Sequence, residues 1–166
     1  MKNQESVTAR SPLPGGGVSM APTLLIVGPV EDDCGHDSVF NHLPWPAHRV
    51  WSYREVALHL HLHSSHPCLV LCERDLADGD WKDVLEVTVS LTSPPPVIVT
   101  SRHADEHLWA EVINLGGFDV LAKPLDKQEV SRVLNFAWEH WAAQAYPAAR
   151  PKAELVGKGE KTCSTA

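Results

Sequence analysis

The sequence carries no excess of positive charge. Its 14 lysine and arginine residues stand against 21 aspartate and glutamate residues, which gives a formal net charge of -7. A protein that follows a nucleic-acid backbone needs a basic surface to neutralise the phosphates. The charge balance therefore argues against direct binding of nucleic acid.

Long hydrophobic runs are also missing. Residues 1–22 contain no continuous apolar run that could form the core of a signal peptide, and no stretch approaches the length of a membrane-spanning helix. We therefore expect a cytoplasmic protein with no membrane partner.

Cysteine is scarce and lacks the spacing of a metal site. The four cysteines, Cys34, Cys68, Cys72 and Cys163, form no CxxC pair. Cys68 and Cys72 lie in a predicted buried strand, where alternation of side chains places both on one face. We expect free buried thiols rather than a disulfide or a structural zinc site.

The 166 residues, of which 43% are hydrophobic, are enough for one domain of ordinary size. Residues 1–22 are rich in serine, proline and glycine, and the C-terminal stretch has no apolar periodicity. We therefore predict a folded domain over residues 23–142, a disordered N-terminal segment (1–22) and a disordered C-terminal tail (143–166).

Five short apolar runs predict strands that are buried on both faces. They cover residues 24–27, 48–51, 68–72, 96–100 and 118–122. Helical patterns lie between them, so the expected fold is a doubly wound α/β fold of five βα units with right-handed crossovers and a parallel sheet.

Capping residues predict where three of the helices begin: Ser52 with Glu55, Asp105, and Asp126 with Glu129. Gly116 and Gly117 suit the C-terminal end of the helix that Asp105 opens. Residues 57–63 alternate with a period of two, as in a strand, but the preceding cap and the need for a crossover favour a helix. A first helix within residues 32–43 is expected from the alternation of elements alone.

Acidic, hydroxyl and basic residues lie at the ends of three predicted strands. Glu73 ends the third strand, Thr100 and Ser101 end the fourth, and Lys123 with Pro124 ends the fifth. In an open parallel sheet, ligands and chemistry gather at the carboxyl ends of the strands. We therefore take these residues as the candidate site.

Residues 23–142 resemble the receiver domain of bacterial two-component response regulators. In that family an aspartate that accepts a phosphoryl group ends the third strand, and a Thr or Ser and a Lys, usually followed by Pro, stand where Thr100 and Lys123–Pro124 stand here. Thr100 lies 27 residues and Lys123 lies 50 residues after Glu73, as in the family. The resemblance implies a flavodoxin-like (βα)5 fold with strand order 2-1-3-4-5.

The sequence departs from the family at the residues that carry its chemistry. The phosphoacceptor is replaced by Glu73, and Gly28 and Pro29 stand where the family has two acids that hold Mg2+. Glu31, Asp32 and Asp33 could take that place only if Pro29 entered a central strand, which proline disfavours. Since Mg2+ is held mainly by carboxylates, we expect its binding to be weak or absent and expect no other cofactor.

The position of the family's switch aromatic falls on Val120. Alternation along the fifth strand predicts that Phe118 lies on the same side of the sheet as Val120 and could substitute for the missing ring.

The resemblance therefore implies an atypical receiver that is not an enzyme and that acts by binding a protein: a sensor kinase, another regulator, a second receiver or a second copy of itself. Glu73 either imitates a phosphorylated aspartate or only forms an ion pair with Lys123. The alternative is a receiver that still accepts phosphate from a sensor histidine kinase, on Glu73, Asp75 or Asp78.

Three other features of the sequence have alternative interpretations. His59 and His63 share a helix face as two metal ligands would, but a lone HxxxH is more often solvent-exposed. A flavin or nucleotide site would need a phosphate-binding loop after the first strand, where Gly28 is instead followed by acids. Trp138 and Trp141 fit either the core or a protein contact.

Overall fold

The computed structural model describes residues 23–30, 39–62 and 67–145. The N-terminal segment, most of the C-terminal tail, Cys34, Cys163 and His63 lie outside these residues, as do Glu31, Asp32 and Asp33.

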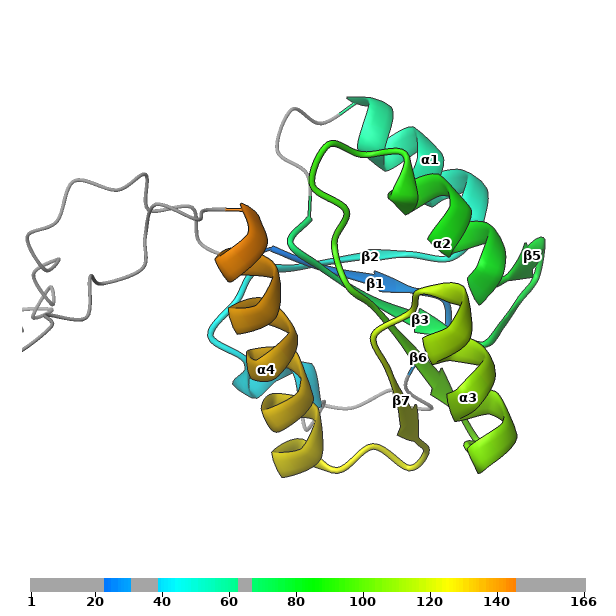
Figure 1. Cartoon of the computed structure of the whole chain (residues 1–166), viewed down its shortest axis with the longest axis vertical. Coiled ribbons are helices and arrows are strands. Elements are labelled where there is room, and N and C mark those ends of the chain that lie inside the picture. The colour runs from blue at the N-terminus through cyan, green and yellow to red at the C-terminus, as the bar shows by residue number, and fades with distance from the viewer. Residues whose placement is uncertain (1–22, 31–38, 63–66, 146–166) are drawn as a thin grey trace, which may run out of the picture.

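Five parallel strands form the central sheet (Figure 1). They are β1 (Leu24–Val27), β2 (Ala47–Val50), β3 (Leu69–Glu73), β6 (Val97–Ser101) and β7 (Asp119–Ala122). The strand order is β2-β1-β3-β6-β7, with every neighbouring pair parallel. This order confirms the predicted doubly wound fold.

Four α-helices and a short 3-10 helix connect the strands of the described residues. The α-helices are α1 (Tyr53–Leu62), α2 (Trp81–Val89), α3 (Glu106–Leu115) and α4 (Lys127–Ala145), and the 3-10 helix η1 spans Val39–His42. The expected first helix is thus described only at its end, as one turn of 3-10 helix. A two-stranded antiparallel ribbon, β4 (Asp75–Leu76) with β5 (Gly79–Asp80), was not predicted.

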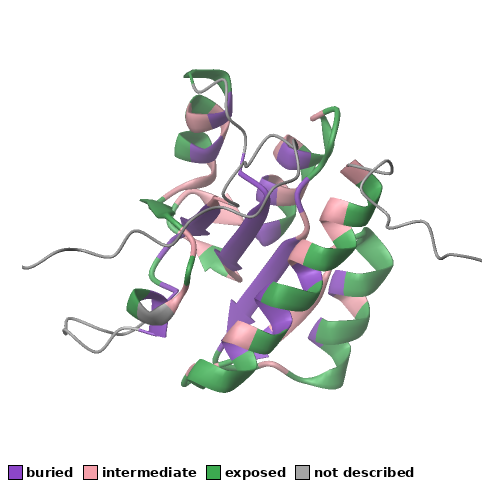
Figure 2. Ribbon diagram, turned by 90° about the vertical axis from the view of Figure 1, so that its left-hand side faces the viewer, coloured by how far each residue is buried: buried purple, intermediate pink, exposed green. Residues whose placement is uncertain are grey.

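The helices cover both faces of the sheet (Figure 1), and each face buries its own apolar cluster. Helices α1, α2 and α3 pack on one face with residues such as Val56, Trp81 and Leu108. Helix α4 and η1 pack on the other face, for example with Phe40 and Leu134. The central strands are buried on both faces (Figure 2), as their continuous apolar sequences predict.

The predicted caps do begin the helices. Ser52 Oγ accepts a hydrogen bond from Glu55 N at 3.2 Å, and Asp105 Oδ1 accepts one from Leu108 N at 2.8 Å. The segment that begins at residue 57 and alternates with a period of two is helical through Leu62, as the preceding cap predicted. Helix α3 ends at Gly116 in the left-handed conformation with φ 97°, as expected for a C-terminal glycine.

Helix α2 begins with a capping box that the sequence analysis overlooked. Asp80 accepts a hydrogen bond from Lys82 N at 2.7 Å, and Asp83 accepts one from Asp80 N at 2.9 Å. The signal was available, because two aspartates three residues apart precede a helical pattern.

One expectation about the fifth strand was wrong. Phe118 packs against the α4 side of the sheet, with its ring 5.7 Å from Phe136, whereas Val120 packs against the α3 side. The strand begins only at Asp119, so the alternation that we extended back to Phe118 does not apply there. Phe118 and Val120 therefore lie on opposite sides of the sheet, and the prediction that they share one side is wrong.

Cys68 and Cys72 are free and buried, as predicted. Burial raises the pKa of both thiols, most strongly that of Cys72. Trp138 packs against the core cluster on the α4 side and stacks on Trp141 at 5.5 Å. Among the described helices, none has the length and apolarity that a membrane span requires.

Candidate functional site

The carboxyl ends of the strands bring the predicted site residues together. Glu73 of β3 is in register with Thr100 of β6, and Lys123 directly follows β7. Gly28 follows β1, on the other side of β3. Parallel pairing alone thus places four chain segments at one edge of the sheet.

Glu73 is held by both polar neighbours that the sequence indicated. Its Oε2 accepts a hydrogen bond from Thr100 Oγ1 at 3.1 Å and forms a close ion pair with Lys123 Nζ. The two side chains of this ion pair are only 14% and 6% exposed. Attraction between charges is stronger where water is largely excluded, so the pair fixes both side chains in place.

The Lys123 ammonium also reaches the end of the first strand. Its Nζ donates a hydrogen bond of 2.8 Å to the carbonyl oxygen of Pro29. One cation therefore links the chain after β7 both to Glu73 and to the segment after β1. This is the position at which the resemblance would place a phosphoryl group and its metal.

Gly28 has no room for a larger side chain. It has φ 81°, which favours glycine, and a Cβ built there would lie 2.6 Å from Leu76 Cδ2 and 3.1 Å from Glu73 Cβ. Arg49 Nη1 also lies within 3.4 Å of its carbonyl oxygen. The local backbone is therefore built for glycine and would not accommodate an acid without movement.

The acids of the loop after β3 serve as helix caps or lie at the surface. Asp78 accepts hydrogen bonds from Tyr53 N at 3.2 Å and from Arg54 N at 3.4 Å, so it caps α1 from 25 residues away. Asp75 is exposed and pairs with Arg74 at 3.5 Å. No sequence pattern predicts the contact of Asp78, because it joins two distant segments.

Ser101 and Pro124 belong to the connections around the site. Ser101 is buried, and its Oγ accepts a hydrogen bond from His103 N at 3.0 Å, in the loop that leads to α3. The peptide bond between Lys123 and Pro124 is cis. Thr100, rather than Ser101, is the hydroxyl that contacts Glu73.

No cluster of metal-ligating side chains is found in the part of the chain that the structure describes. Within residues 23–30, 39–62 and 67–145, no group of three or more His, Cys, Asp or Glu side chains is arranged to hold a metal ion. The carboxylate of Glu73 is already paired with Lys123, and Gly28 cannot supply a second one. His59 lies with its ring 5.6 Å from that of His48.

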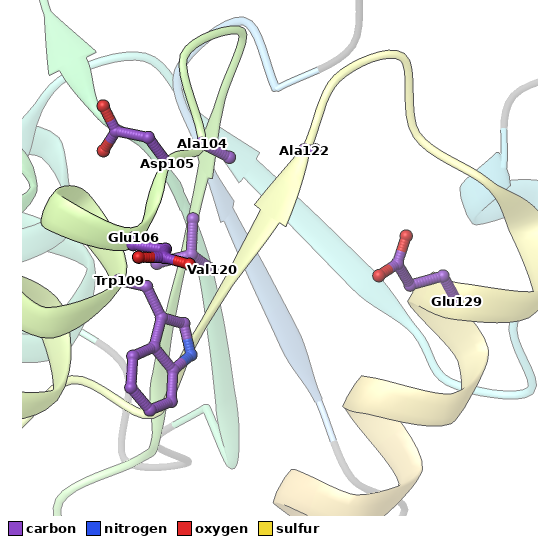
Figure 3. A pocket seen from close by; sticks show the side chains of 7 residues that line it. All are labelled: Ala104, Asp105, Glu106, Trp109, Val120, Ala122 and Glu129. Carbon is purple, nitrogen blue, oxygen red and sulfur yellow. The ribbon is translucent and has the colours of Figure 1, made fainter.

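Val120 lies beside a groove that the sequence analysis did not predict. The groove is lined by Ala104, Asp105, Glu106, Trp109, Val120, Ala122 and Glu129 (Figure 3). The small side chains of Val120 and Ala122 were a usable signal in the sequence, because they leave space above the strand that larger side chains would fill.

Comparison with known proteins supports the same fold. No family model matches the chain. The transcriptional regulatory protein ZraR of Klebsiella oxytoca is 25% identical over 134 residues, which cover 77% of this chain and 29% of that protein. The chain spans less than a third of the length of the curated relatives that it matches.

Two solved structures match most of the chain. The signal receiver domain of an HD domain-containing protein from Pseudomonas fluorescens Pf-5 has a TM-score of 0.66 and 24% identity, covering 80% of this chain and 98% of that one. NtrX from Brucella abortus has a TM-score of 0.65 and 22% identity, covering 84% of this chain and 32% of that one. With its strand order and helix placement, the chain therefore has the fold of a response-regulator receiver domain.

Proposed function

We propose that this chain is an atypical receiver domain that acts in signal transduction by binding a partner protein, without phosphorylation that depends on Mg2+. The observation that carries the proposal is the position of Lys123. Its ammonium is bound at once to Glu73 and to the carbonyl oxygen of Pro29. These contacts support the proposal, because by resemblance Lys123 is the residue that would pair with a phosphoryl group, and here its ammonium is already bound to the chain.

The chemistry of phosphoryl transfer supports the proposal. This reaction depends on the position of the nucleophile in line with the leaving group and on neutralisation of charge. The Glu73 carboxylate extends one methylene further than an aspartate, and its Oε2 is engaged by Thr100 and Lys123. It is a poorly placed nucleophile whose charge is already neutralised.

The same contacts favour a permanent arrangement of the strand ends. Thr100 and Lys123 are the residues that, by resemblance, would contact a phosphoryl group, and here they contact a carboxylate that is part of the chain. The negative charge is therefore always present. We infer that Glu73 acts as a fixed contact that keeps the domain in one conformation.

Intact mass measurement tests the absence of phosphorylation. The full chain is incubated with acetyl phosphate and Mg2+, beside a receiver domain with an aspartate phosphoacceptor as the control for the donor. We expect the control to gain the mass of one phosphate and this chain to gain none.

A gain of one phosphate by this chain would overturn the proposal. The variants Glu73→Gln, Asp75→Asn and Asp78→Asn would then identify the residue that accepts the phosphate. Only the variant without that acceptor would show no gain of mass. Loss of the gain in one of these variants would support the alternative function, a receiver that is phosphorylated by a sensor kinase.

A further inference from the structure

The groove between α3, β7 and α4 has an apolar floor and two walls of different chemistry. Ala104, Val120 and Ala122 form the floor (Figure 3). Trp109 and Glu106 come from α3 on one side, and Glu129 comes from α4 on the other. The cavity volume is about 240 Å³. Pockets for drug-sized ligands have volumes of about 300–1,000 Å³, so the groove fits a single side chain better.

Trp109 is held in place although it is largely exposed. The residue is 51% exposed. Its indole Nε1 donates a hydrogen bond of 3.2 Å to Asp119 Oδ1 at the start of β7. A ring that is already ordered loses little entropy when it binds. Tryptophan faces attract cations, and Trp and Arg are the residues most enriched at the energetic centres of interfaces.

Every charged residue that lines the groove is an acid. Asp105 is occupied as the N-cap of α3, where the hydrogen bond from Leu108 N lowers the pKa of its carboxyl. Glu106 and Glu129 are exposed and stand on opposite walls (Figure 3). A cation in the groove would therefore lie among carboxylates, with Trp109 and Glu106 together on the α3 side and Glu129 on the α4 side.

We propose that this groove binds an arginine side chain presented by the partner protein. The aliphatic part would lie over Val120 and Ala122, and the guanidinium would stack on Trp109 between Glu106 and Glu129. Arginine fits better than lysine, because its planar and weakly hydrated head stacks on aromatic rings and donates a fork of hydrogen bonds to a carboxylate. The inference rests on the proposed function, since it names the chemistry by which the partner is bound.

The test uses the full chain labelled with 15N and two short peptides. One peptide is acetyl-Leu-Arg-Leu-amide, and the other carries citrulline, which keeps the shape of arginine but has no charge. We expect the arginine peptide to shift the Trp109 indole and the Val120 amide resonances. The citrulline peptide should bind roughly threefold to tenfold more weakly, as expected for a partly exposed cation–π and charge contact.

Variants locate the contact in the groove. Glu106→Gln combined with Glu129→Gln, and separately Trp109→Leu, should each weaken binding of the arginine peptide by a similar factor. Glu139→Gln removes an exposed carboxylate from the same helix as Glu129 but outside the groove lining, and it should leave binding unchanged. The dispersion of the amide spectrum verifies that each variant is folded.

Three results would overturn the inference: equal binding of the two peptides, equal loss in Glu139→Gln, or shifts of the same resonances on concentrating the chain without peptide. The last would show that a second copy occupies the groove. None of these three results involves phosphate transfer. Failure of the arginine-binding inference is therefore distinguishable from failure of the proposed function, which would appear as a gain of phosphate mass.

Discussion

Lys123 Nζ donates a hydrogen bond of 2.8 Å to the carbonyl oxygen of Pro29, which lies 94 residues earlier in the chain. The same ammonium forms the ion pair with Glu73. The ends of β1, β3 and β7 are therefore connected through one side chain. Removing this cation would leave the Glu73 carboxylate without its counter-ion and the Pro29 carbonyl group without this donor.

Replacement of Lys123 by methionine should destabilise the fold. It leaves Glu73, whose side chain is 14% exposed, without its counter-ion, and breaking a largely buried pair from one side costs about 3 kcal/mol in the free energy of unfolding. Urea denaturation measures the loss. The double variant Lys123→Met, Glu73→Gln should be more stable than Lys123→Met alone, because no unpaired charge is left.

The matched control is Lys82→Met. Lys82 pairs with Glu111 at 2.6 Å, but its side chain is 46% exposed, so its loss should be much smaller. If the two lysine variants lost equal stability, the ion pair of Glu73 with Lys123 would contribute no more than an exposed ion pair at the surface.

Replacement of Gly28 by alanine should lower stability by about 1–2 kcal/mol, because alanine disfavours φ 81° and its Cβ would press on Leu76 and Glu73. Gly116→Ala is the control: its φ is 97°, but a Cβ there meets nothing within 4 Å. We expect a smaller loss for Gly116→Ala in urea denaturation. Equal losses in the two variants would mean that Gly28 is needed only for its backbone angle.

Replacement of Asp78 by alanine should cost about 1 kcal/mol, because the amides of Tyr53 and Arg54 at the start of α1 lose their side-chain acceptor, while Ser52 still accepts from Glu55 N. Asp75→Ala removes an exposed acid from the same loop and should change stability little. Thermal unfolding followed by circular dichroism compares the two variants. A loss confined to Asp75→Ala would contradict the structural role assigned to Asp78.

The cap of α3 should make stability depend on pH. The hydrogen bond from Leu108 N lowers the pKa of Asp105 below its ordinary value of 3.8. The unfolded chain therefore binds a proton first as the pH falls, and the stability that the cap contributes at neutral pH is lost below pH 3.8. Asp105→Asn still caps the helix but does not titrate.

The difference in melting temperature between the parent and Asp105→Asn should consequently shrink between pH 5 and pH 2. A difference that stays constant over this range would show that the charge of Asp105 contributes nothing. The other carboxylates titrate in the same way in both proteins, so their effect cancels in the difference between the two melting temperatures. One of them is Glu111, whose pKa is lowered by its hydrogen bond with Lys82.

Local patterns in the sequence were sufficient for the strands of the central sheet, but not for the β4–β5 ribbon. The apolar run Leu24–Val27 became β1 without a change of boundary, and the cap at Asp105 marked the start of α3 correctly. Each of these patterns occupies only a few consecutive residues. A strand that is buried on both faces must be continuously apolar, and the first backbone amides of a helix need hydrogen-bond acceptors. The side of Phe118 was predicted wrongly, because the limit of β7 depends on pairing with β6.

The residues of the site were also predictable, since parallel strands deliver Glu73, Thr100 and Lys123 to one edge of the sheet whatever the loops do. Their contacts were not. The hydrogen bond from Lys123 to Pro29 and the cap that Asp78 provides for α1 join segments that no local pattern relates. Such contacts depend on how loops pack after the sheet has formed.

The sequence by itself determined the parallel sheet and the residues that stand at the strand ends, among them Glu73, Gly28 and Pro29, because strand periodicity and residue type are local properties of the chain. Only the tertiary structure decided that Lys123 binds Glu73 and Pro29 together and that Trp109 and Glu129 face one groove. Those relationships are distances between elements far apart in the chain, and packing alone sets them.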